Sequence, residues 1–329
     1  MSTIRSIWIA LALGTVALVA ASNAAAQGAP WPNRPIRIVV PLPPGGSPDY
    51  LSRLLAERLQ PVLGQPLVVE NRPGGAGVIA REHVARQAPD GYTLLLTESS
   101  QVMSAAVGSK LPYDPIRDFE PIVLAAEIPF VLAVNSGTPA RTLNEFIAHA
   151  KAAPKPLTYG TAGVGQPHHI SAELLRSMTA INIVHIPYKG SAGIVPALLT
   201  NEIDFTIGAV NSLLPHFRSG KLRAIALAGA ARTAILPDVP TMAEAGPLPG
   251  YAVDIWLGVT APAGTPRPIV ERLNAEINRI VRDPQLVKER FATVGLEPRG
   301  STPGQFLEVM KSDLAKYAKL AKDANIKPE

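Results

Sequence analysis

Hydrophobic residues recur along the chain in two alternating patterns: short β-branched runs, and longer stretches with apolar residues on one helical face. The runs Ile36–Pro41, Leu67–Glu70 and Tyr92–Thr97 are typical of buried strands. The stretch Pro48–Leu63 has the helical pattern, and a second helix follows the Gly-rich turn in "NRPGGAGVIAREHVARQAPDG". The order strand, helix, strand, helix, strand predicts a doubly wound parallel sheet.

A second unit of alternating helices and strands occupies the middle of the chain. Its apolar patterns switch between the same two periods, which predicts a second α/β sheet. The C-terminal part adds one strand and two amphipathic helices. The predicted elements of both regions are Leu143–Ala153 (helix), Leu157–Gly160 (strand), His168–Met178 (helix), Ile183–Pro187 (strand), Gly193–Leu199 (helix), Ile203–Ala209 (strand), Leu213–Ser219 (helix), Leu222–Ala228 (strand), Val253–Ala261 (strand), Pro268–Val281 (helix) and Pro303–Leu320 (helix).

Two extended apolar stretches, Ile122–Val134 and Tyr251–Pro262, lie between the two units and have the composition of strands. Two such crossings would place the middle of the chain in one lobe and both ends in the other. We therefore expect an α/β protein of two lobes, joined by a hinge of two strands. The expected boundaries are residues 27–127 plus 254–329 for lobe 1 and residues 128–253 for lobe 2.

The first residues have the features of a secretory signal peptide. Arg5 supplies a short positive region, Ile7–Ala21 is almost wholly apolar, and Ala24–Ala26 offers a cleavage site before Gln27. The apolar run is shorter than the roughly 20 residues that a spanning helix needs. We expect residues 1–26 to be removed and the mature protein to be located in the periplasm; the alternative is a retained membrane anchor.

Composition narrows the class of protein further. With 329 residues and 47% apolar content, the chain is long enough to bury one core or two. It has no cysteine, which excludes disulfides, thiol chemistry and lipid attachment through a cysteine. The net charge is +5, but lysine and arginine are scattered and form no basic run of the kind that binds nucleic acid.

Two loops share one pattern of strand, Gly-rich turn, proline and helix. They are "VVPLPPGGSPDYLSRLL" (residues 39–55) and "LTYGTAGVGQPHHISAELL" (residues 157–175). Pro48 and Pro167 suit the first helical position, and Ser47 is the expected N-cap. Because the free N–H groups at a helix start attract anions, the two loops, opposed across a cleft, could grip a carboxylate. A purely structural turn is the alternative for either loop alone.

Sequence motifs give catalysis no positive support. The chain has no G-x-S-x-G elbow and no phosphate-binding G-x-x-x-x-G-K-[ST] loop. His168 and His169 are adjacent, so they cannot share one helix face around a metal. Asp49 and Arg53 are four residues apart on the first helix and are expected to form an ion pair. We expect no cofactor and no metal; an exported enzyme acting on a carboxylated substrate stays open as the alternative function.

Eight blocks of the sequence, in the same order, resemble the periplasmic solute-binding receptors of tripartite tricarboxylate transporters, often called the Bug family. The resemblance covers nearly all of the mature chain. The blocks are "WPNRPIRIVVPLPPGGSPDYLSRLLAERL", "VVENRPGGAGVIA", "APDGYTLLL", "LPYDPIRDFEPI", "GTAGVGQPHH", "HIPYKG", "LPDVPTMAEAG" and "GVTAPAGTP".

The resemblance implies a two-lobed type II periplasmic binding protein of the Venus-flytrap kind, which closes on a small organic carboxylate. It implies partners too: the membrane subunits of a tripartite tricarboxylate transporter and, in a sensory role, a signalling kinase. The ligand-binding positions it implies are Pro44, Gly45, Gly46, Ser47, Asp49 and Tyr50 in the first loop; Glu98, Ser99 and Ser100 after the third strand; Thr161, Ala162, Gly163, Gly165, Gln166 and His168 in the second loop; Ala209 and Asn211; and Asp254 and Trp256 on the second crossing.

The chain departs from the commoner family pattern at Leu42, at Gln166–Pro167 and around Ser47. These positions fall where the distal end of a ligand would lie, so the resemblance implies the ligand's class but not its identity. A third hypothesis is that the protein, within the same fold, carries an apolar or aromatic acid.

Three further residues stay ambiguous in the sequence. It leaves open whether Tyr50 and Trp256 line the cleft or pack in the core. Lys189, in "HIPYKG", is interpreted as part of a structural turn rather than an anion clamp.

Overall fold

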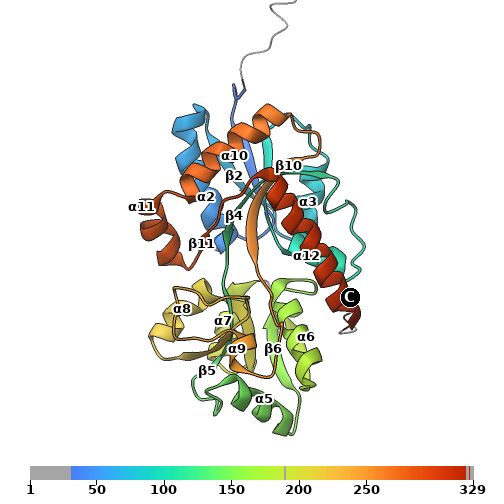
Figure 1. Ribbon diagram of the computed structural model, residues 1–329, viewed down its shortest axis with the longest axis vertical. Coiled ribbons are helices and arrows are strands. Elements are labelled where there is room, and N and C mark those ends of the chain that lie inside the picture. The colour runs from blue at the N-terminus through green and yellow to red at the C-terminus, as the bar shows by residue number, and fades with distance from the viewer. Residues whose placement is uncertain (1–30, 189, 324–325, 327–329) are drawn as a thin grey trace, which may run out of the picture.

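The computed structural model describes residues 31–188, 190–323 and 326, and it has two lobes, each built around one β-sheet (Figure 1). The six-stranded sheet of lobe 1 has the order β11-β4-β10-β3-β1-β2, and the five-stranded sheet of lobe 2 has the order β7-β6-β8-β5-β9. The strands are β1 (Ile36–Val40), β2 (Leu67–Asn71), β3 (Thr93–Glu98), β4 (Phe119–Glu127), β5 (Phe130–Asn135), β6 (Leu157–Thr161), β7 (Ile183–Pro187), β8 (Phe205–Ala209), β9 (Leu222–Leu227), β10 (Trp256–Pro262) and β11 (Glu297–Pro298).

Helices flank both sheets (Figure 1). Those of lobe 1 are α2 (Ser47–Leu63), α3 (Val78–Ala85), α4 (Ser100–Ala106), α10 (Arg267–Val281), α11 (Pro284–Leu286) and α12 (Pro303–Asp323), with single turns at Gly75–Gly77, Val287–Phe291 and Ala292–Val294. Those of lobe 2 are α5 (Leu143–Ala152), α6 (Pro167–Thr179), α7 (Ser191–Leu199), α8 (Val210–Arg218) and α9 (Met242–Ala245).

The prediction of a doubly wound parallel sheet holds for only part of each sheet. In lobe 1, β1 pairs in parallel with β2 and β3, but β10 runs antiparallel to β3 and β4. In lobe 2, β6 pairs in parallel with β7 and β8, whereas β5 runs antiparallel to β8 and β9. Both sheets are therefore mixed, because each contains a strand that enters directly from the other lobe rather than through a helical crossover.

The two predicted crossings form the hinge. The first, Ile122–Val134, covers most of β4 of lobe 1 and most of β5 of lobe 2, and the second leads from lobe 2 into β10. They lie side by side: the N–H of Ile128 donates to the carbonyl of Ile255 at 2.7 Å (Figure 1). The sequence alone could not show that the two crossings are adjacent, and the structure shows it.

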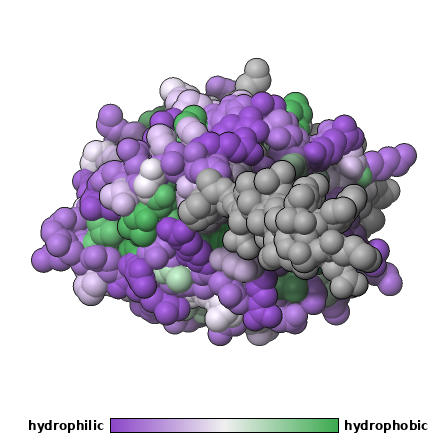
Figure 2. Space-filling view, turned by 90° about the horizontal axis from the view of Figure 1, so that it is seen from above, coloured by the Kyte–Doolittle hydropathy of each residue, from purple (hydrophilic) through white to green (hydrophobic). Residues whose placement is uncertain are grey.

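Amphipathic periodicity accounts for the helices that the sequence predicts well. The apolar face of α2 includes Leu51, Leu54 and Leu55, all at most 1% exposed, and it packs beside β1 and β2. The outer polar faces of such helices make the part of this surface that is visible from above mainly hydrophilic, with a hydrophobic area to the left of the view (Figure 2). Within the described residues, no helix combines the length and apolar character needed to cross a membrane. The predicted signal peptide lies outside the described residues, as does Lys189.

Candidate functional site

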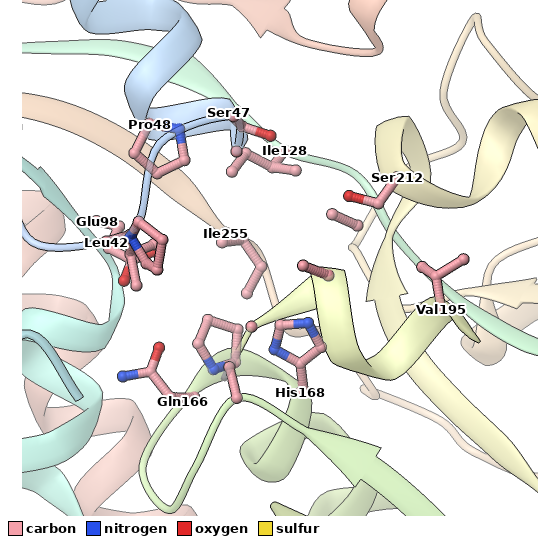
Figure 3. Close-up of a pocket in the computed structure, with 18 of the residues that line it drawn as sticks. Leu42, Ser47, Pro48, Glu98, Ile128, Gln166, His168, Val195, Ser212 and Ile255 are labelled. Carbon is pink, nitrogen blue, oxygen red and sulfur yellow. The ribbon is translucent and has the colours of Figure 1, made fainter. Parts of the chain in front are cut away.

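A cavity of about 430 Å³ lies between the lobes and is lined from both of them (Figure 3). This volume is in the usual range for small-ligand sites. The wall contributed by lobe 1 includes residues 42–48 and Glu98, and Ile128 and Ile255 come from the two crossings. Lobe 2 contributes Phe130, Ala162, Gln166, Pro167, His168, Gly190, Ala192, Val195, Pro196, Ala209 and Ser212. We call this space the interlobe cavity.

The lobe 1 wall is formed by the loop between β1 and α2. Gly46, rather than Ser47 as predicted, is the N-cap of α2, and Ser47 is the first helical residue. The backbone N–H groups of Gly46, Ser47 and Asp49 have no hydrogen-bond acceptor among the described residues. They are unused donors at a helix start that faces the cavity, which is the arrangement that attracts anions.

Asp49 braces this loop from behind instead of binding in the cavity. Its Oδ2 accepts from the N–H of Gly45 and from Nε of Arg53, both at 3.0 Å, so the predicted ion pair is confirmed. Burial by itself raises the pKa of Asp49, but hydrogen bonds from Arg53 and Gly45 outweigh it and leave the pKa lowered. The Gly45 N–H is thereby occupied, although the residue itself lines the cavity.

The second loop is braced in a different way. The Oγ1 of Thr161, at the end of β6, accepts from the N–H of Gly163 at 3.0 Å and lies 2.5 Å from Nε2 of His185. This holds the turn that leads to Gln166, the N-cap of α6, and to Pro167, which occupies the first helical position as predicted. Gln166 and His168 both reach the cavity (Figure 3).

His168 is a buried neutral histidine on the cavity wall. It is 8% exposed, its ring packs edge-on against Phe130 at 4.9 Å, and burial lowers its pKa to about 4. Its Nδ1 is buried without a partner among the described residues. An orphaned N–H costs more than an orphaned lone pair, so the tautomer with the proton on Nε2 is favoured.

Four helices begin at the interlobe cavity. Besides α2 and α6, the first turns of α7 and α8 contribute lining residues, and in Figure 3 Ser212 points toward the cavity from α8. Each helix start carries a partial positive charge, and the four act on one shared space. No lysine or arginine is among the described residues that line it. The cavity can therefore favour an anion without any cationic side chain on its described wall.

Glu98 is the one carboxyl side chain among the described lining residues, and it is 5% exposed. Its Oε1 accepts from the hydroxyl of Ser100 at 2.7 Å and lies 3.7 Å from Nη2 of Arg81. Arg81 is fully buried behind it and also donates to Ser100 and to the carbonyl of Ala76. Burial raises the pKa of Glu98, and Arg81 and Ser100 only partly oppose this.

The lobes touch each other on either side of the cavity. Nδ2 of Asn211 in lobe 2 donates to Oγ of Ser47 in lobe 1 at 2.8 Å. Nε2 of Gln166 donates to the carbonyl of Ala76 at 3.1 Å, so that one oxygen accepts from both lobes. Both bonds exist because the lobes lie close together, and opening the hinge would break them.

The structure places several predicted positions away from the cavity wall. Tyr50 instead donates its hydroxyl to the carbonyl of Arg290 at 2.9 Å. Trp256 is core: it is 2% exposed, packs edge-on against Phe306 and donates its indole N–H to Asp313 at 2.7 Å. Asp254 lines a separate cavity behind the hinge. The other predicted positions that do not line the interlobe cavity brace the lining residues or pack behind them. They are Asp49, Ser99, Ser100, Thr161, Gly163, Gly165 and Asn211.

Sequence reasoning also missed part of the wall. Val195, Pro196 and Ser212 lie in helices that read as ordinary packing helices, and Ile128 and Ile255 lie in the crossings. The two crossing residues could have been found, because a ligand between two lobes must rest against the strands that join them. Among the described residues there is no group of three or more histidine, cysteine, aspartate or glutamate side chains that could hold a metal ion.

A family model described as the tripartite tricarboxylate transporter family receptor matches residues 51–326 of this chain. The chain belongs to this receptor family. Its relatives include protein BugT of Bordetella pertussis, which is 37% identical over 299 residues, covering 90% of this chain and 91% of BugT. The family resemblance read from the sequence is thereby confirmed.

Solved structures confirm the two-lobed fold. Rpa4515 of R. palustris, solved with adipate, is 35% identical, has a TM-score of 0.85, and is matched over 91% of this chain and 100% of its own. MatC of Rhodopseudomonas palustris, solved with bound malate, is 31% identical, has a TM-score of 0.81, and is matched over 88% and 99%. Carboxylates are thus the ligands in two related receptors, and the family is one of solute-binding proteins.

Proposed function

We propose that this receptor binds a small organic carboxylate in the interlobe cavity, in the periplasm, and delivers it to the membrane subunits of a tripartite tricarboxylate transporter. The observation that carries the proposal is the convergence of four helix starts on a cavity whose described wall has no lysine or arginine. The related receptors solved with adipate and malate support the same ligand class.

The carboxylate would be held by backbone donors. At the start of α2, the N–H groups of Gly46, Ser47 and Asp49 have no acceptor within the described residues, and the hydroxyl of Ser47 keeps its own proton to donate. From lobe 2, the favoured tautomer of His168 offers Nε2–H. Hydrogen bonds to an ionised group are roughly twice as strong as neutral ones, and desolvation of the ligand between the lobes would strengthen them.

The two lobes would be the moving bodies, with the boundaries predicted above: residues 27–127 plus 254–329, and residues 128–253. The hinge is the pair of crossings joined by the bond from Ile128 to Ile255. Because the ligand-binding groups come from both lobes, closure would complete the site, and the bonds from Asn211 and Gln166 would stabilise the closed form.

A thermal-shift screen of the mature chain, from Gln27, tests the proposal. The protein is first unfolded and refolded to remove carried-over ligand and then mixed with aliphatic and aromatic carboxylates. An acid present at 100 times its Kd should add about 2.7 kcal/mol to the free energy of unfolding. One or a few acids raising the melting temperature would support carboxylate capture, and no shift with any acid would contradict it. Turnover of the bound acid to a product would instead favour the enzyme alternative.

A further inference from the structure

We infer that the ligand carries an ammonium group as well as a carboxylate, and that Glu98 binds the ammonium group. This inference rests on the proposed function and deepens it, because it names the class of acid. It starts from the one charged side chain on the described wall of a cavity that otherwise favours anions. In its ionised form, a carboxyl group there would repel an anionic ligand unless the ligand also brings a cationic hydrogen-bond donor to it.

Glu98 is built into the wall rather than placed there by a mobile side chain. It ends β3, is 5% exposed, and lies, like Leu42, on the lobe 1 side of the cavity (Figure 3). Both of its described partners, Ser100 and Arg81, act on Oε1. No hydrogen bond to Oε2 is found among the described residues, so this oxygen keeps its capacity to accept.

The charges around Glu98 favour a zwitterion over a simple anion. Arg81 balances one negative charge from behind but does not line the cavity, so it cannot touch the ligand. Its closest approach to Glu98 is 3.7 Å, which is longer than a direct hydrogen bond. A ligand with two carboxylates would add a second negative charge beside Glu98, whereas an ammonium group would complete its hydrogen bonding and compensate its charge.

The competing explanation is that Glu98 serves only as the counterion of Arg81. In that case it would affect the stability of the protein but not the choice between ligands. The ratio of two affinities separates these roles, because a general loosening of the site lowers both affinities together.

The experiment compares acids of one carbon skeleton by calorimetry on refolded, ligand-free mature protein. Hexanoate, adipate, norleucine and 6-aminohexanoate share six carbons and one carboxylate, and they differ in whether a second carboxylate or an amino group is present and where it lies. Butanoate, succinate and the two corresponding amino acids repeat the comparison at four carbons. The pair 3-phenylpropanoate and phenylalanine repeats it on an aromatic skeleton. A hydrogen bond between charged groups predicts that the best amino acid binds about tenfold or more tighter than its parent acid and than any matching diacid.

Two variants assign this preference to Glu98. We expect E98Q to bring the ratio of the two affinities to within about threefold, because a neutral amide no longer attracts the ammonium charge. Since E98Q leaves Arg81 without its counterion, the double variant R81M/E98Q removes both charges and should show the same loss of preference. Thermal melts without ligand show whether each variant folds.

Two results would overturn the inference alone: a diacid or parent acid that binds as tightly as the amino acids, or a preference for amines that survives in both E98Q and R81M/E98Q. If no acid on any skeleton binds, the proposed function fails first, and this inference fails with it.

Discussion

Asn211 and Ser47 lie 164 positions apart in the chain and share a hydrogen bond of 2.8 Å across the two lobes. The bond joins the first turn of α8 to the first turn of α2, beside the interlobe cavity that Ser47 lines. It links the position of the lobes to the loop that presents free N–H groups to the ligand. Closure and ligand binding are therefore expected to depend on the same contact.

Removing the Asn211 amide should weaken ligand binding without unfolding either lobe. The net contribution of such a bond is about 0.5–1.5 kcal/mol, so we expect Asn211→Ala to raise the Kd about twofold to tenfold, mainly through faster dissociation. Stopped-flow and calorimetric titration with the best acid of the screen measure this. Asn182→Ala, an exposed change in the same lobe, is the control. Equal affinities for N211A and the wild type would show that the bond does not stabilise the closed form.

Gly46 is the position where substitution reports most directly on the ligand. Its backbone is extended, with φ −83° and ψ 174°, and a Cβ there would meet only Cδ of Pro48, at an ordinary 3.7 Å. The protein itself thus has room for a Cβ at this position, where a ligand bound against the loop would meet an added side chain. We expect Gly46→Ala to weaken binding and Gly46→Val to weaken it more than tenfold, a loss of at least about 1.4 kcal/mol.

The matched change at Gly45 should behave differently. Its φ of +94° disfavours any L side chain, so Gly45→Val is expected to lower the melting temperature even without ligand. Melting curves and titrations of the two valine variants separate these effects. If Gly46→Val binds the acid as the wild type does, the carboxylate does not lie against this loop.

Individual helices and strands show which parts of the fold could be predicted from the sequence. The helix predicted at Pro268–Val281 is α10, Arg267–Val281, because its apolar residues follow a clear helical period. The helix α4, which begins at Ser100 just after β3, was missed because its seven residues are too few to show a helical period. The direction of β10 was also missed, since a strand's own sequence does not specify which neighbour it pairs with.

The site shows the same limit more sharply. The glycine and proline pattern predicted both loops, because those residues act on their own backbone. The pairing of Asn211 with Ser47 joins positions 164 apart in the chain, and that of Arg81 with Glu98 joins a helix to the strand that follows it. A single polar residue in a helix or loop gives no signal of its partner, so these contacts needed the structure.

Trp256 provides a test of the division between core and cavity. Its indole N–H is bonded to Asp313, a carboxyl group whose pKa is raised by burial. Trp256→Phe leaves that group without its donor and should lower the free energy of unfolding by about 1–3 kcal/mol. The Kd for the ligand should stay unchanged, because the side chain does not line the cavity. Urea unfolding measures the change in stability, and calorimetry measures the Kd. If the variant is as stable as the wild type but has lost affinity, the indole lies against the ligand.

His168 should make the protein sensitive to acid. Burial lowers the pKa of His168 in the folded protein to about 4 from its usual 6.5. Between these values the unfolded chain binds a proton that the folded protein does not, so stability is full above pH 6.5 and is lost as the pH falls toward 4. The shift corresponds to at most roughly 3 kcal/mol. His169, whose pKa burial also lowers to about 4, acts in the same direction.

Replacing His168 isolates its share of this effect. His168→Phe keeps an aromatic ring against Phe130 but cannot take up a proton. Its free energy of unfolding should fall less than that of the wild type between pH 7 and pH 4, with the remaining fall due to His169 and other groups. The raised pKa of Glu98 works in the opposite sense, but it is common to both proteins and cancels in the difference. Urea unfolding across this pH range measures the difference in the free energy of unfolding between the two proteins, with His216→Gln on α8 as the control. Parallel curves for H168F and the wild type would mean that His168 is not kept neutral by burial.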